Sequence, residues 1–208
     1  MAELDFYTNP QSRGQIVRWM LEEVGASYET HILDYATTLK GPEYLAINPM
    51  GKIPAIVHRG KVVTEWAAIC AYLADAFPDA GLAPDRSDRA DYYRWMFFAS
   101  GPIEQAFSNK SAGYEPTPEK QRMFGYGNFD LTVDTAEKAL AGKTFIAGER
   151  FSAADVVFGS QLNFLIMFKM LEPRPVFSDY VARITDRDAY RRGQALDKEA
   201  AEKMKTPA

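Results

Sequence analysis

The first half of the chain switches between the hydrophobic periods of strands and of helices. Apolar and polar residues alternate in short runs, which predicts strands, at 4–7, 28–34, 55–58 and 61–63. Apolar residues recur at helical spacing over 15–24, and an alanine-rich stretch predicts a helix over 65–77. The stretch 37–48 reads as a loop with at most a short helix at 42–46. This order of elements predicts a small sheet with helices on both faces, which is a thioredoxin-like arrangement.

The second half of the chain has the pattern of helices throughout. Two prolines and a glycine in 78–85 interrupt the preceding pattern and predict a linker. Five helices are expected beyond it, at 89–107, 119–141, 156–170, 177–185 and 188–203. The first of these is apolar on nearly all sides, which indicates burial on several faces. The spacing of Ser152 and Asp155 is that of a capping box, so we expect Asp155 to be structural rather than catalytic.

These patterns predict two domains of different class. We expect an α/β thioredoxin-like N-terminal domain over residues 1–78, a linker over 79–86, and an all-α C-terminal helical domain over 87–208.

Composition excludes several classes of function. The 208 residues carry 24 basic and 28 acidic side chains without long runs of one sign, which argues against binding nucleic acid or a membrane surface. One cysteine, Cys70, excludes an intramolecular disulfide, and two separated histidines argue against a zinc site. The first residues lack the basic and apolar regions of a signal peptide, and nowhere do eighteen apolar residues follow one another. We therefore expect a soluble, cytoplasmic protein without a metal.

The stretch around Pro54 carries the most specific pattern in the chain. Asn48-Pro49-Met50-Gly51 has the composition of a loop, and Ile53-Pro54 then leads into a strand at Ala55. A proline at the first residue of a strand gives up a backbone donor where the ladder can spare it. Only about 5 to 6% of X-Pro bonds in folded proteins are cis, so the residues alone leave this isomer open.

Taken as a whole, this stretch resembles the glutathione-binding half of a glutathione S-transferase. The resemblance consists of Asn-Pro-x-Gly-Lys-Ile-Pro-Ala-Ile, followed about ten residues later by an acidic residue, Glu65, which opens an alanine-rich helix. An all-helical second domain extends the likeness to nearly the whole chain. The resemblance implies that Pro54 is cis and that the main chain of Ile53 binds the cysteinyl backbone of glutathione, as in strand addition.

The resemblance also implies how the rest of the tripeptide is bound. Glu65 matches the acidic residue that meets the amino group of the γ-glutamyl moiety. The family usually follows it with Ser or Thr, but this chain has Trp66, so the hydroxyl contact is lost while the backbone N–H remains. Lys40 and Lys52 are candidates for the glycyl carboxylate.

The catalytic group is expected in the loop 9–14, between the first strand and the first helix. The reaction needs a thiolate, so a donor must stabilise the anion. Counted from Tyr7 at the strand end, Ser12 matches the spacing of serine-type members of the family, so the resemblance implies Ser12 first. Other registers leave four alternatives open, which are Tyr7, Asn9, Gln11 and Arg13. Ser12 has a competing role as a cap of the following helix.

The second substrate is expected to lie between the domains, against aromatic side chains at Tyr93, Phe97 and Tyr114, which suit a small hydrophobic electrophile. The aromatic run from Tyr92 to Phe98 also fits the homodimer that the family forms. The expected function is conjugation of the glutathione thiolate to such electrophiles in detoxification. A glutathione-dependent disulfide or peroxide reductase and a non-catalytic binding protein are the alternatives, and Trp66 favours the last of them.

Overall fold

The computed structural model describes residues 3–205, which form two compact units. Contacts group the described residues up to Leu82 with those from Asp186 onward, and Ala83–Thr185 forms the second unit. The predicted domain ranges begin at residue 1 and end at residue 208, and residues 1–2 and 206–208 lie outside the described part.

The first unit is built on a four-stranded sheet. Its strands are β1 (Leu4–Thr8), β2 (Tyr28–Ile32), β3 (Ala55–His58) and β4 (Lys61–Thr64), in the order β2-β1-β3-β4. β1 pairs with β2 in parallel and with β3 antiparallel, and β3 pairs with β4 antiparallel. This mixed sheet confirms the predicted thioredoxin-like fold.

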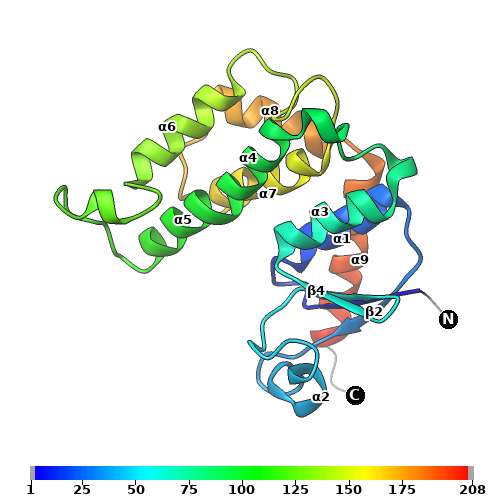
Figure 1. Ribbon diagram of the computed structural model, residues 1–208. Helices are drawn as coiled ribbons and strands as arrows, with labels where there is room; N and C mark the ends of the chain where they lie inside the picture. Colours follow the sequence, from blue (N-terminus) through cyan, green and yellow to red (C-terminus); the bar gives the residue numbers. More distant parts are fainter. Residues whose placement is uncertain (1–2, 206–208) are drawn as a thin grey trace. The chain divides into compact units, whose positions relative to one another are not determined.

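Helices cover both faces of this sheet (Figure 1). On one face lie α1 (Gly14–Val24) and α3 (Trp66–Ala76), and on the other lies the short α2 (Pro42–Leu45), which follows the 3-10 turn η1 (Thr38–Lys40). Side chains of β1 alternate between the two faces. Phe6 is fully buried beneath Arg18 of α1, whereas Tyr7 packs on the α2 side with Tyr44 and Ala55.

The last helix, α9 (Asp188–Lys205), also belongs to the first unit, where it packs along α1. Two ion pairs join the two helices, Arg18–Asp197 at 2.7 Å and Glu22–Arg192 at 2.9 Å. A third, Glu23–Arg187 at 2.6 Å, joins α1 to the residue just before α9. Arg18 and Asp197 are both buried, and Arg18 also donates to Tyr28 and Thr30. The last helix of the predicted 87–208 domain therefore makes its contacts in the first unit.

The second unit is helical, as its sequence pattern predicts. It begins after the short turns η2 (Pro78–Ala80) and η3 (Arg86–Asp88), and its helices are α4 (Ala90–Phe98), α5 (Glu104–Ser111), α6 (Phe129–Leu140), α7 (Ala153–Met167) and α8 (Pro175–Thr185). α4 runs into α5 through one π-helical turn, η4 (Ala99–Ile103), which contains Pro102. No helix within residues 3–205 is long and apolar enough to cross a membrane.

The starts of α6 and α7 can be compared with those expected from the sequence. The helix expected over 119–141 begins only at Phe129, so that prediction was wrong at its start. Residues 112–128 form a loop with a single 3-10 turn, η5 (Gln121–Met123), because Gly127 has φ +69° and Asn128 then caps the helix by accepting from the Leu131 N–H at 2.8 Å. The capping box at Ser152 and Asp155 is confirmed. Asp155 is fully buried and accepts hydrogen bonds from Ile146, Ser152 and Tyr180, which is a structural role.

Candidate functional site

The register of the sheet brings three predicted segments to one end of it. Tyr7 near the end of β1 pairs with Ala55 at the start of β3, and Ala55 pairs with Thr64 at the end of β4. The loop 9–14 follows β1, the Ile53–Pro54 bond precedes β3, and Glu65 follows β4. Segments that are separate in the sequence therefore meet at the same end of the sheet.

The peptide bond between Ile53 and Pro54 is cis, as the resemblance implied. Just before it, the carbonyl oxygen of Lys52 accepts hydrogen bonds from the Tyr44 hydroxyl at 2.5 Å and from the Asn48 carboxamide at 2.8 Å. The side chain of Ile53 packs on the cluster that contains Tyr44 and Ala55. Among residues 3–205, the main-chain N–H and C=O of Ile53 make no hydrogen bond, so both can bind a ligand.

Glu65 precedes α3 in a conformation that is rare for a residue with a side chain. Its φ is +65° and its ψ is 110°, and its side chain is exposed. Such conformations cost about 1 to 3 kcal/mol and concentrate at functional sites. The motif located Glu65, but the sequence carries no signal for this backbone geometry.

The side chain of Trp66 faces the core, because only 8% of the residue is exposed. It shares the buried side of α3 with Ile69, Cys70 and Leu73, which follow it at helical spacing. Its backbone N–H belongs to the first turn of the helix, where the amides have no partner within the helix. The indole is therefore a core group, and the helix N-terminus at Glu65 and Trp66 remains available to an anion.

Ser12 is held by the loop that carries it. Its hydroxyl donates to the carbonyl oxygen of Asn9 at 2.6 Å and accepts from the N–H of Gly14 at 2.9 Å. Its side chain is partly buried, and α1 begins two residues later. The position suits a donor at a helix N-terminus, although the hydroxyl hydrogen already has an acceptor.

The four alternatives to Ser12 lie in different surroundings. Asn9 is buried, and its carboxamide donates to Leu33 and accepts from Gln11. Gln11 is exposed, and Arg13 is the residue that immediately precedes α1.

Tyr7, the fourth alternative, packs against the α2 side of the sheet. Its ring stacks on His31 with centroids 4.6 Å apart and lies 5.6 Å from that of Tyr44. Burial raises the pKa of the Tyr7 hydroxyl, and the charges of Asp5 and Glu29 raise it further. The phenol therefore stays protonated at neutral pH.

The two lysines predicted to meet a carboxylate differ in how they are held. Lys40 donates from Nζ to the carbonyl oxygens of Gly51 at 2.8 Å and Met50 at 3.3 Å, which leaves one of its three hydrogens for a ligand. Lys52 has its carbonyl fixed, as described above, while its side chain is exposed.

A second group of polar side chains, which the sequence analysis missed, lies on β1 and β2. Asp5, Glu29 and His31 place one ligand atom each within 4.8 Å of the others, and Nε2 of His31 lies 2.9 Å from Oδ1 of Asp5. An imidazole and two carboxylates could hold a divalent cation. Only the parallel register, which pairs Asp5 with Glu29, brings these residues together.

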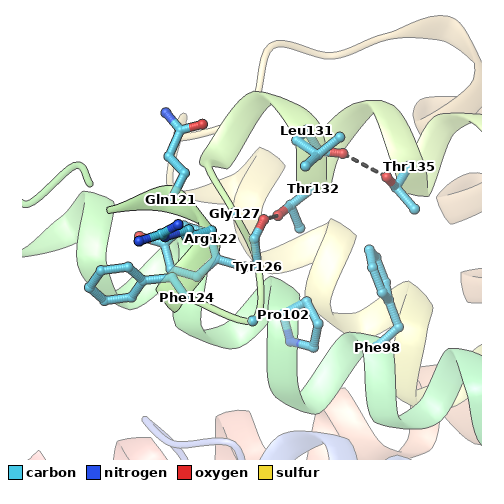
Figure 2. A pocket seen from close by; sticks show the side chains of 11 residues that line it. Phe98, Pro102, Gln121, Arg122, Phe124, Tyr126, Gly127, Leu131, Thr132 and Thr135 are labelled. Atoms are coloured by element: carbon cyan, nitrogen blue, oxygen red, sulfur yellow. Dashed lines mark hydrogen bonds between the residues drawn. The ribbon is translucent and has the colours of Figure 1, made fainter. Parts of the chain in front are cut away.

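Two cavities of the second unit have linings that include aromatic side chains. The larger, of about 500 Å³, is lined by aromatic and apolar side chains together with Gln121, Arg122 and two threonines (Figure 2). Both threonine hydroxyls donate to main-chain oxygens of the same unit. Thr132 donates to those of Tyr126 and Asn128, and Thr135 donates to that of Leu131. The smaller cavity, of about 210 Å³, is lined in part by Lys110, Tyr114, Tyr126 and Phe129.

The three residues predicted to meet the second substrate occupy two places in this unit. Tyr93 and Phe97 are neighbours on α4, with ring centroids 6.5 Å apart, and both are exposed. Tyr114 lies in the loop after α5, where its ring packs 5.7 Å from that of Phe124.

Comparison with known proteins agrees with this architecture. Residues 12–76 match the family model for the N-terminal domain of glutathione S-transferase. Glutathione S-transferase GST-4.5 of Xanthomonas campestris is 30% identical over 159 residues, which cover 73% of this chain and 78% of that protein. Glutathione S-transferase GstA of Escherichia coli O157:H7 is 29% identical over 152 residues, covering 71% and 74%.

Solved structures match over almost the full length. A sphingomonad glutathione S-transferase complexed with glutathione has a TM-score of 0.77 and 26% identity, covering 93% of this chain and 98% of that one. The fold and the sequence matches agree: this chain belongs to the glutathione S-transferase family of enzymes.

Proposed function

We propose that this protein conjugates the thiolate of glutathione to small apolar electrophiles. One observation carries the proposal: three features meet at the same end of the sheet. They are the unpaired main chain of Ile53, the exposed Glu65 and the loop that holds Ser12. A tripeptide needs main-chain partners, an anionic partner for its amino group and a donor for its sulfur. This end of the sheet offers all three.

Recognition of glutathione is assigned to the following groups. The N–H and C=O of Ile53, oriented by the cis bond to Pro54, pair with the cysteinyl main chain. Glu65 accepts from the γ-glutamyl amino group, and the backbone N–H of Trp66 donates to the γ-glutamyl carboxylate. Lys40 and Lys52 meet the glycyl carboxylate.

Ser12 is assigned to the thiolate. A free thiol has a pKa of about 8.5, and lowering it by roughly two units requires about 2.7 kcal/mol of stabilisation of the anion. A hydrogen bond to a charged group contributes about 1.5 to 3 kcal/mol, so one hydroxyl at the N-terminus of α1 is sufficient in magnitude. The Ser12 hydroxyl must turn its hydrogen from Asn9 to the sulfur when the ligand binds.

The electrophile and the dimer are assigned to the second unit. Tyr93 and Phe97 expose 40% and 70% of their surface side by side on α4, and we assign this aromatic surface to apolar contacts. Aromatic walls favour apolar substrates. A homodimer should give twice the monomer mass in sedimentation equilibrium, and a monomer at all concentrations would remove this part of the proposal.

Calorimetric titration with glutathione tests the assignment directly. We expect saturable binding with a Kd of about a millimolar or tighter, which corresponds to about 4 kcal/mol or more. Conjugation of a generic aryl halide should then saturate with glutathione. If the protein does not bind glutathione at millimolar concentration, it is a non-catalytic member of the fold.

Glutathione-dependent reduction of disulfides or peroxides is a second candidate. Cys70 is fully buried and burial raises its pKa, so this reaction, like conjugation, would use the thiol of the ligand. Assays of disulfide and peroxide reduction beside conjugation rank the two reactions, and a higher kcat/KM for reduction would replace the first proposal.

A further inference from the structure

Two Asn-Pro dipeptides lie in loops of the first unit. Asn9-Pro10 follows β1, and Asn48-Pro49 follows α2. Only 1% of Asn9 and 5% of Asn48 is exposed, so each carboxamide has left water and needs partners within the protein.

Both asparagines make the same three kinds of hydrogen bond. The side-chain oxygen accepts from the N–H two residues on, which is Gln11 at 2.9 Å for Asn9 and Met50 at 3.1 Å for Asn48. The main-chain oxygen accepts from the N–H three residues on, which is Ser12 at 3.1 Å and Gly51 at 2.8 Å. The side-chain nitrogen then donates to a further carbonyl oxygen at 2.8 Å in each case.

The further carbonyl differs between the two turns. Asn9 bonds to Leu33, just after β2, and thereby fastens the loop 9–14 to a neighbouring strand end. Asn48 bonds to Lys52, the residue immediately before Ile53. The main-chain oxygen of Asn9 also receives the Ser12 hydroxyl. One turn therefore fixes the position of Ser12, and the other fixes the peptide that leads into Ile53.

We propose that Asn9 and Asn48 are two positioning residues with separate tasks, an inference that rests on the proposed function. Asn9 positions Ser12 and so governs thiol activation. Asn48 positions the main chain of Ile53 and so governs glutathione binding. Each carboxamide makes these hydrogen bonds within the protein, so the task assigned to it is to hold the main chain and not to bind the ligand.

Kinetics of Asn9→Ala and Asn48→Ala separate these tasks. In Asn9→Ala, kcat should fall on the order of 10- to 100-fold, the cost of a misplaced catalytic group, while KM for glutathione changes little. The pKa of the bound thiol, followed by the ultraviolet absorbance of the thiolate against pH, should rise towards that of free glutathione. In Asn48→Ala, KM and Kd for glutathione should rise about tenfold, while the pKa of the bound thiol stays unchanged.

Asn128→Ala is the matched control. Asn128 also accepts from a main-chain N–H, that of Leu131, and donates from its side chain, to Gln121, but it caps α6 in the second unit. Urea unfolding of all three variants measures the common loss of stability. If an alanine variant does not fold, Asn9→Ser or Asn48→Ser retains an acceptor for the N–H two residues on and replaces it.

Three results decide the matter. A fall in kcat confined to Asn9→Ala, together with a rise in KM confined to Asn48→Ala, supports the proposal. If both variants change kcat and KM by the same factors, or match Asn128→Ala, the asparagines are structural and the proposal is wrong while the transferase assignment stands. If the wild-type protein does not bind glutathione, both fail together.

Discussion

The hydroxyl of Ser12 donates its hydrogen to the main-chain oxygen of Asn9, 2.6 Å away, while its oxygen accepts from Gly14. The same side chain thus organises the start of α1 and is the donor that we propose for the thiolate. Loss of this hydroxyl should therefore affect stability and turnover together, and the two effects have to be measured separately.

Ser12→Ala should lower the free energy of unfolding by about 1 kcal/mol, because the Gly14 N–H loses its acceptor. Turnover in aryl halide conjugation should fall on the order of 10- to 100-fold, since the thiolate loses its donor, with little change in Kd for glutathione. Ser12→Thr keeps a hydroxyl and should retain more turnover. Ser111→Ala, which removes an exposed hydroxyl bonded to Phe107, is the control. Unchanged turnover would remove Ser12 from the mechanism.

The backbone of Glu65 predicts an unusual ranking of substitutions. At φ +65°, Glu65→Gly should be more stable than Glu65→Ala by about 1 kcal/mol, because glycine adopts this conformation without strain. Both should weaken glutathione binding by about tenfold, since the amino group loses its partner. Ala68→Gly, at an exposed position of the same helix, should instead cost about 1 kcal/mol. Thermal unfolding and calorimetry of the three variants check this order, and a glycine that destabilises equally at both positions would contradict it.

The buried ion pair between Arg18 and Asp197 should be costly to break. Arg18→Met leaves the Asp197 carboxylate buried without its partner and should lower the free energy of unfolding by about 3 to 5 kcal/mol. The double variant Arg18→Met with Asp197→Leu should lose much less than the sum of the two single changes. Arg59→Met breaks an exposed pair with Glu3 and should leave the urea midpoint nearly unchanged. Additive losses in the double variant would show that the two groups are not coupled.

His58 should make stability depend on pH. Burial lowers the pKa of this imidazole from 6.5, and the neighbouring Arg59 lowers it further. The unfolded chain therefore binds a proton more readily than the native one, so stability is full above about pH 6.5 and declines as pH falls towards the native pKa. His58→Gln should remove this part of the slope of unfolding free energy between about pH 7 and about pH 5. An identical slope in the variant and the wild-type protein would exclude this role for His58.

Prediction from the sequence was most accurate where a local pattern of residues determines the local structure. Alternation and helical spacing gave the strands and most helices, and the cis bond at Pro54 followed from the resemblance. The burial of the Trp66 side chain could also be predicted from the sequence. It stands three, four and seven residues before Ile69, Cys70 and Leu73, so the helical period alone places it on the buried side.

What the sequence could not supply depends on pairing between distant segments. The meeting of Asp5 and Glu29 with His31 requires the parallel register of β1 and β2, which no local pattern contains. The rare φ of Glu65 results from the way β4 leads into α3. The predicted helix at 119–141 began too early, because the positive φ of Gly127 and the cap by Asn128 determine where α6 begins.

The attachment of α9 to α1 has a consequence for synthesis on the ribosome. All contacts of Ala83–Thr185 are available once Thr185 has left the exit tunnel, whereas the first unit still lacks α9 at that moment. The carboxylate of Asp197 reaches the guanidinium of Arg18 only after the second unit has been made. The segment translated first is therefore the last to be completed, and until then the α1 surface that receives α9 stays open to chaperones.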